Sequence, residues 1–148
     1  MRRGVWRTLT VMTAAATLMA AGCGGSSTTT TPPTTPTPTS ATETFTGTLN
    51  VNGGASFPFT VNGAGLITST LAALTAPDGS TPDPAPSIGL SLGTWNGTSC
   101  QVVLANDNAF QGQQLIGQST SSGNLCVRLS DVGKLTSPLA YTVTVVHP

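Results

Sequence analysis

From residue 42 onward, hydrophobic and polar residues alternate in short runs, and no stretch of ten residues keeps the 3.6-residue period of a helix. The clearest runs are 57–61, 88–92 and 141–145. A period of two buries one face of a strand and leaves the other face in water. Seven or eight strands are therefore predicted, at residues 43–51, 55–62, 65–74, 87–93, 99–105, 112–118, 124–130 and 139–147.

Turn-forming residues separate these runs, for example Asn52-Gly53 and Asn62-Gly63. Short strands with frequent turns over about 107 residues are typical of one antiparallel domain built from two packed sheets. The sequence therefore predicts an all-β sandwich over residues 42–148.

Two stretches leave alternatives open. The second half of 65–74 also fits a helix. The neighbours of Cys126 are apolar and expected to face inward, which places Cys126 on the outer face with Arg128. Cys100, in contrast, shares parity with the apolar Val102. A disulfide between the two cysteines then requires either a sheet edge or a bulge that shifts the phase of one strand.

The N-terminus has the three parts of a secretory signal peptide: a basic start, an uncharged apolar stretch at 9–21, and small residues before Cys23. The apolar stretch is shorter than the roughly twenty residues that span a bilayer. Residues 1–22 are therefore predicted to be a lipoprotein signal peptide and Cys23 the lipidated residue, with an ordinary signal peptide as the alternative. Acyl chains then hold the protein to a bacterial membrane outside the cytoplasm. Because Gly24 rather than Asp follows the cysteine, the outer membrane is favoured in a Gram-negative cell.

The segment between Cys23 and residue 41 is rich in Thr and Pro and has no charged or large apolar side chain. Such a segment cannot bury enough surface to offset its chain entropy, so it is predicted to be a disordered linker. Its prolines make it a semi-rigid spacer between the lipid and the domain.

Removal of the leader leaves Arg128 and Lys134 against five acidic residues, a net charge of −3. Such a chain is unsuited to binding nucleic acid or to electrostatic adhesion on anionic lipid. The expected partners are the membrane, through the lipid, and an envelope protein or a polysaccharide. Arg128 is expected to pair with Asp131 across a turn.

After lipidation, Cys100 and Cys126 are the remaining cysteines, and in an exported chain they are predicted to form a disulfide. Two buried thiols are the alternative. Their spacing is not that of a zinc site, and the single histidine, His147, is expected at a frayed end. Neither an enzyme activity nor a cofactor is predicted.

Two segments are candidates for ligand contact. Trp95 and Asn96 offer an aromatic face and an amide to a sugar ring, with a half-buried tryptophan at a strand end as the alternative. Asn106, Asp107 and Asn108 offer three oxygen side chains in a row, a weak calcium candidate that a turn explains equally well.

The domain also resembles a known family in its strand patterns. The matching pieces are Phe59-Thr60-Val61, Gly65-Leu66-Ile67-Thr68, Ser87-Ile88-Gly89-Leu90-Ser91-Leu92, Cys126-Val127-Arg128-Leu129 and Tyr141-Thr142-Val143-Thr144-Val145. In these pieces the chain resembles the pre-peptidase C-terminal-like domains of secreted bacterial proteins. The resemblance implies a jelly-roll β-sandwich and an accessory, non-catalytic role, although the cysteine pair departs from the family pattern. The expected function is a non-enzymatic, lipid-anchored interaction or envelope module; the alternative is a carbohydrate- or polymer-binding module acting beside secreted enzymes.

Overall fold

The computed structural model describes residues 39–82 and 84–148, so the predicted signal peptide, Cys23 and most of the linker lie outside the described residues. The described part contains eight strands and no helix. The strands are β1 (Ala41–Leu49), β2 (Gly54–Val61), β3 (Gly65–Thr75), β4 (Ile88–Trp95), β5 (Cys100–Ala109), β6 (Gln114–Ser119), β7 (Gly123–Ser130) and β8 (Leu139–His147). All eight predicted strands are confirmed, with ends that differ from the prediction by at most four residues.

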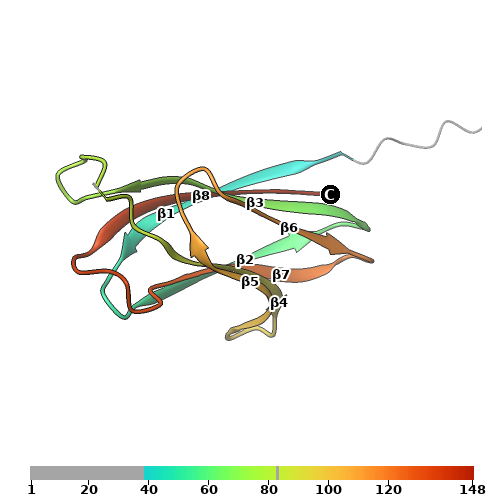
Figure 1. Ribbon diagram of the computed structural model, residues 1–148. Helices are drawn as coiled ribbons and strands as arrows, with labels where there is room; N and C mark the ends of the chain where they lie inside the picture. Colours follow the sequence, from blue (N-terminus) through green and yellow to red (C-terminus); the bar gives the residue numbers. More distant parts are fainter. Residues whose placement is uncertain (1–38, 83) are drawn as a thin grey trace, which may run out of the picture. The chain divides into compact units, whose positions relative to one another are not determined.

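The strands form two antiparallel sheets, in the orders β1-β8-β3-β6 and β2-β7-β4-β5, which pack face to face (Figure 1). Strands from opposite ends of the chain pair with each other: β1 with β8, β2 with β7, β3 with β6, and β4 with β5. Further pairing of β8 with β3 and of β4 with β7 winds this long folded hairpin around one core. This topology is that of a jelly roll, as predicted.

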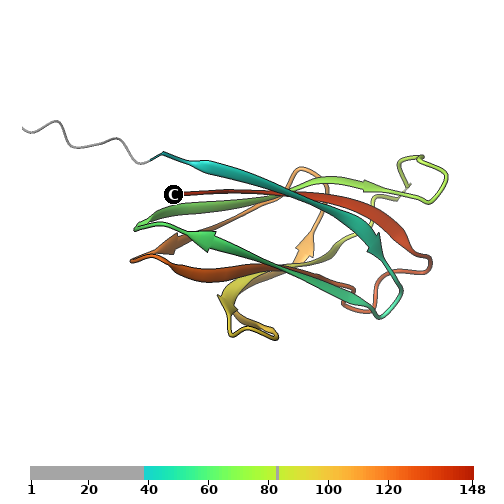
Figure 2. The same cartoon turned by 180° about the vertical axis from the view of Figure 1, so that it is seen from behind.

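The sandwich has two distinct ends. The start of β1 and the end of β8 lie together, since Ala41 is opposite His147 in the register, and we name this the Ala41 end. At the other end, which we name the loop end, the connections 50–53, 76–87 and 131–138 gather (Figure 1). Seen from behind, the connection 50–53 carries the chain from β1 in one sheet to β2 in the other (Figure 2).

The core consists of the inward residues of both sheets, and it explains why the period of two predicts the strands so well. Leu71, Val143 and Val145 of one sheet and Leu90 and Leu129 of the other are fully buried. Each such side chain contributes about 1.5–3 kcal/mol when it leaves water.

Aromatic rings close the core where β1, β2 and β8 meet. The Phe45 and Phe57 rings stack with centroids 4.9 Å apart, and Tyr141 lies 6.1 Å from Phe57. A Cβ atom on Gly47 would lie 2.5 Å from the Tyr141 hydroxyl oxygen, so a glycine is needed opposite this tyrosine.

A bulge in β3 accounts for the helix-like pattern of its second half. The register shifts between Leu71 and Ala73, so that Leu71 and Leu74 both point inward although they are three residues apart. A spacing of three also fits one face of a helix, which is why the sequence alone left both readings open. The segment is a strand throughout.

The hydroxyl of Ser69 gives a test of the core. It is the one buried side-chain oxygen or nitrogen in the described part of the chain that has no hydrogen-bond partner. Because an unpaired buried hydroxyl is destabilising, we expect Ser69→Ala to raise the free energy of unfolding by about 1 kcal/mol in urea denaturation. Ser119→Ala is the matched control, since the Ser119 hydroxyl donates to the Gly63 carbonyl at 2.8 Å and its loss should lower stability. Equal losses in both variants would contradict this account of the core.

Candidate functional site

Asp131 joins two connections of the loop end. One carboxylate oxygen accepts the Asn52 N–H at 2.7 Å, and the other accepts the N–H groups of Lys134 at 2.8 Å and Leu135 at 3.1 Å. Asn52 has a positive φ of 56°, so the bond also supports a backbone conformation that non-glycine residues rarely adopt. The hydrogen bond from Asn52, followed by those of the 133–135 turn, lowers the pKa of Asp131.

The predicted pair of Arg128 and Asp131 does not form. Both oxygens of the Asp131 carboxylate are used on backbone N–H groups, and no ion pair joins it to Arg128 in the described residues. The reason is local, because an aspartate at the start of a turn satisfies the turn's own donors before it reaches for a distant guanidinium.

Lys134 connects its own loop to two further segments at the same end. Its ammonium donates to the Ser87 hydroxyl and to the backbone oxygen of Asp107, each at 3.2 Å, and to the side-chain oxygen of Asn108. The loop 76–87, the end of β5 and the loop 131–138 are thus held by one charged group.

These contacts bear on the calcium candidate in β5. These residues lie within β5 at a register shift and not in a turn, and the Asn106 oxygen accepts the Asn108 N–H at 3.0 Å. Lys134 donates to the backbone oxygen of Asp107 and to the side-chain oxygen of Asn108. No group of three or more His, Cys, Asp or Glu side chains that suits a metal occurs in the described residues.

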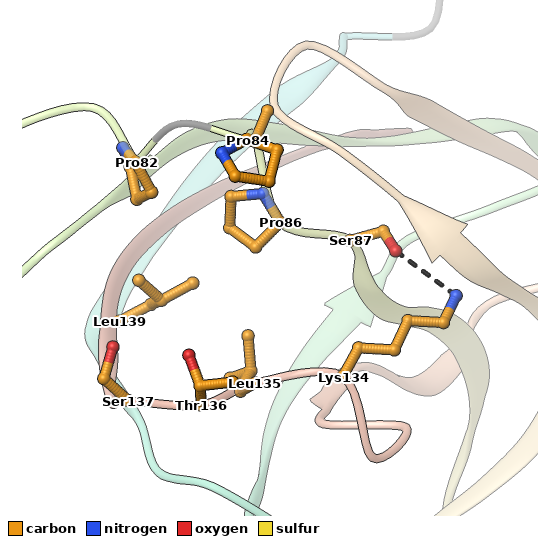
Figure 3. Close-up of a pocket in the computed structure, with 10 residues that line it drawn as sticks. Pro82, Pro84, Pro86, Ser87, Lys134, Leu135, Thr136, Ser137 and Leu139 are labelled. Atoms are coloured by element: carbon orange, nitrogen blue, oxygen red, sulfur yellow. Dashed lines mark hydrogen bonds between the residues drawn. The ribbon is translucent and has the colours of Figure 1, made fainter.

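A groove of about 470 Å³ lies between the loops 76–87 and 131–138 (Figure 3). Pro82, Pro84 and Pro86 form one side, and the segment 134–137 forms the other. Leu139, which is 3% exposed, also lines it. Prolines restrict the backbone of one wall, and hydrogen bonds of Asp131 and Lys134 hold the other. Sequence patterns could not reveal it, because its two walls are about fifty residues apart in the chain.

The predicted disulfide between Cys100 and Cys126 is present, and its geometry resolves the parity conflict. Cys126 is opposite Gly93 on the outer face, as predicted, yet it is fully buried. A register shift between Leu92 and Gly93 places a bulge in β5 and brings Cys100 to that same face. The bridge therefore lies both at a bulge and at a sheet edge, since β5 is also the edge strand of its sheet.

Gly93 makes the bridge sterically feasible. Strands β5 and β7 flank β4 and would be about 10 Å apart in a flat sheet. The Cα atoms of the two cysteines are only 5.7 Å apart, so the start of β5 bends over the outer face of β4. At the crossing, a Cβ on Gly93 would overlap the backbone carbonyl of Gln101.

Trp95 and Asn96 lie far from the groove. They follow the start of β4 by seven residues, about 23 Å along an extended strand, towards the Ala41 end. The Asn96 side-chain oxygen accepts the N–H groups of Thr98 at 3.0 Å and Ser99 at 2.8 Å, so it closes its own turn. Trp95 is half-buried opposite Cys100, which agrees with the alternative of a half-buried tryptophan at a strand end.

The expectation that His147 sits at a frayed end is wrong. Its side chain is 2% exposed, and its ring lies 5.1 Å from that of Phe59. Nε2 lies 3.2 Å from a Glu43 carboxylate oxygen, and Nδ1 lies 3.2 Å from the Pro148 oxygen. The histidine belongs to the alternating pattern of β8 and fastens β8 to β1.

Comparison with protein-family models and with curated proteins finds no match to this chain. The resemblance to pre-peptidase C-terminal-like domains therefore stays a prediction. In the residues that the structure describes, no helix is long and apolar enough to cross a membrane.

The disulfide should contribute measurably to stability. The bridge closes a loop with a sequence separation of 26, so the double variant Cys100→Ala/Cys126→Ala should lose about 3 kcal/mol of unfolding free energy in urea denaturation. The purified wild type, denatured without reductant, should show no reactive thiol at either position. A modified Cys100 or Cys126 in that experiment would refute the bridge.

Asp131 should give stability a defined pH dependence. The pKa of its carboxyl is lowered from 3.8 in the folded state, so its contribution is present above the unfolded pKa and is lost as pH falls through the folded one. Thermal unfolding of wild type and Asp131→Asn, which does not titrate, should differ by a constant amount at pH 5–8. The difference should shrink below about pH 4. A difference that grows in acid would mean that the carboxylate is not what holds the two turns.

Proposed function

We propose that this chain is a lipid-anchored, non-enzymatic binding module displayed outside the cytoplasm. The observation that carries the proposal is the Cys100–Cys126 bridge. Structural disulfides persist in exported proteins and are rare in reducing compartments, so the bridge supports the export that the N-terminal pattern predicts. The third cysteine, Cys23, is then the residue that receives lipid.

The arrangement of the two ends supports a role in contact with a partner. The chain enters the domain at Ala41, and the groove lies at the opposite end of the sandwich. The loops around it are held by Asp131 and Lys134, so a ligand would bind without the cost of ordering them. An envelope protein or a polysaccharide is the partner that we propose, and the pre-peptidase C-terminal-like resemblance adds an accessory role beside exported enzymes.

The lipid anchor is tested by metabolic labelling with a fatty-acid analogue in a bacterial host. The wild type should be labelled and should sediment with membranes, whereas Cys23→Ala should be unlabelled and released. Cys100→Ala/Cys126→Ala is the control, because it removes the other cysteines and should keep the label. Equal labelling of wild type and Cys23→Ala would end the lipoprotein proposal.

A further inference from the structure

The outer face of the β1-β8-β3-β6 sheet is rich in threonines, and the exposed apolar residues Leu66, Ile116 and Val146 lie beside them. We name it the threonine face. Strand register aligns the threonines in rows across the sheet. One row spans all four strands as Thr44, Thr144, Thr70 and Gln114. The nine threonines of the face are Thr42, Thr44, Thr46, Thr48, Thr68, Thr70, Thr75, Thr142 and Thr144. In an ideal sheet the backbone positions of such a face repeat at about 4.8 Å across strands and about 6.7 Å along a strand.

The hydroxyls of this face have no protein partner. In the described residues, none of the nine threonine side chains takes part in a hydrogen bond with another protein group. The turns differ from this face, because the side-chain oxygens of Asn96, Asp78 and Asp131 accept hydrogen bonds from nearby backbone N–H groups. The face thus presents polar groups that the fold itself does not use.

The face also carries no charge. Glu43 lies on β1 but points to the opposite side, where it meets His147. The other described charged residues lie in loops or on the other sheet: Asp78, Asp107, Arg128, Asp131 and Lys134. A face without cations offers nothing to an anionic polymer, and one without anions offers nothing to a basic protein.

We propose that the threonine face binds an uncharged polysaccharide chain at a site separate from the loop-end groove, and this inference rests on the proposed binding function. A threonine hydroxyl both donates and accepts, as sugar hydroxyls do, and its methyl group matches the C–H surface of a sugar ring. Threonine is stiff at χ1 and the strands are hydrogen-bonded to each other, so little entropy is lost on binding. Each contact is weak, and a repeating polymer engages many of them at once.

The twist of the sheet selects a single chain over a crystal surface. Adjacent strands rotate by about 20–25°, which over four strands turns the outer rows well out of one plane. A rigid plane would touch only part of the array, whereas a hydrated chain can follow it. Trp95 lies on the other sheet, so this site is distinct from the one predicted around that residue.

The test is native affinity electrophoresis of the purified chain in gels that contain hydroxyethyl cellulose, galactomannan or dextran. At least one of these neutral polymers should retard the wild type, and anionic alginate should not. Thr44→Val/Thr70→Val/Thr144→Val removes the hydroxyls of the central row but keeps side-chain shape and strand propensity. It should weaken binding by about tenfold or more.

The matched control is Thr94→Val/Thr98→Val/Thr120→Val, three exposed threonines outside the face, which should bind as the wild type does. Far-ultraviolet circular dichroism and urea midpoints establish that both triple variants are folded. Lack of retardation by all three polymers, or equal retardation of both triple variants, would overturn the proposal. So would loss of binding in Trp95→Ala alone, or binding only to microcrystalline cellulose. Fatty-acid labelling at Cys23 is independent of every one of these results.

Discussion

Burial of alternate residues between two four-stranded sheets is the constraint on which the rest of this domain depends. It keeps Leu71, Val145 and Leu129 away from water, and it forces their neighbours outward. The outward residues are then free to serve other purposes: one sheet displays threonines, and the other carries the disulfide and Arg128. Where the strands are irregular, as at the bulge of β3, the register shift returns leucines to the inside.

Most of the fold could be predicted from the sequence because the signal is local. A half-buried strand repeats every two residues, and glycine- and asparagine-rich turns mark its ends. The prediction left alternatives open where a bulge breaks the repeat of two. Leu71 and Leu74 face the same way at a spacing of three, and in β5 a single extra residue moves Cys100 to the face of Cys126. A bulge has no sequence signature as clear as the alternation that it interrupts.

The site was harder to predict because it is assembled over long distances. Asp131 and Asn52 are 79 residues apart, and a carboxylate near a turn gives no hint that it will reach a second turn. The same holds for Lys134, whose ammonium donates to the backbone oxygen of Asp107 and to the side-chain oxygen of Asn108, more than twenty residues earlier in the chain. The position of His147 next to the C-terminus also led to a wrong prediction of a frayed end, since its side chain is one of the most buried polar groups in the described residues. The threonine rows could not be predicted either, because they depend on the register between strands, and the sequence of one strand does not determine that register.

The pairing of β1 has a mechanical consequence for a tethered protein. Any pull transmitted along the chain reaches the domain at Ala41, the first residue of β1. This strand lies at a sheet edge and is paired only with β8, through a ladder of nine residue pairs from Ala41 to Leu49. Tension along the strand axis would load that ladder in shear, so that many hydrogen bonds share the force. If Cys23 carries the lipid that we propose, β1 is both the strand next to the tether and the strand whose pairing with β8 resists drag on the domain.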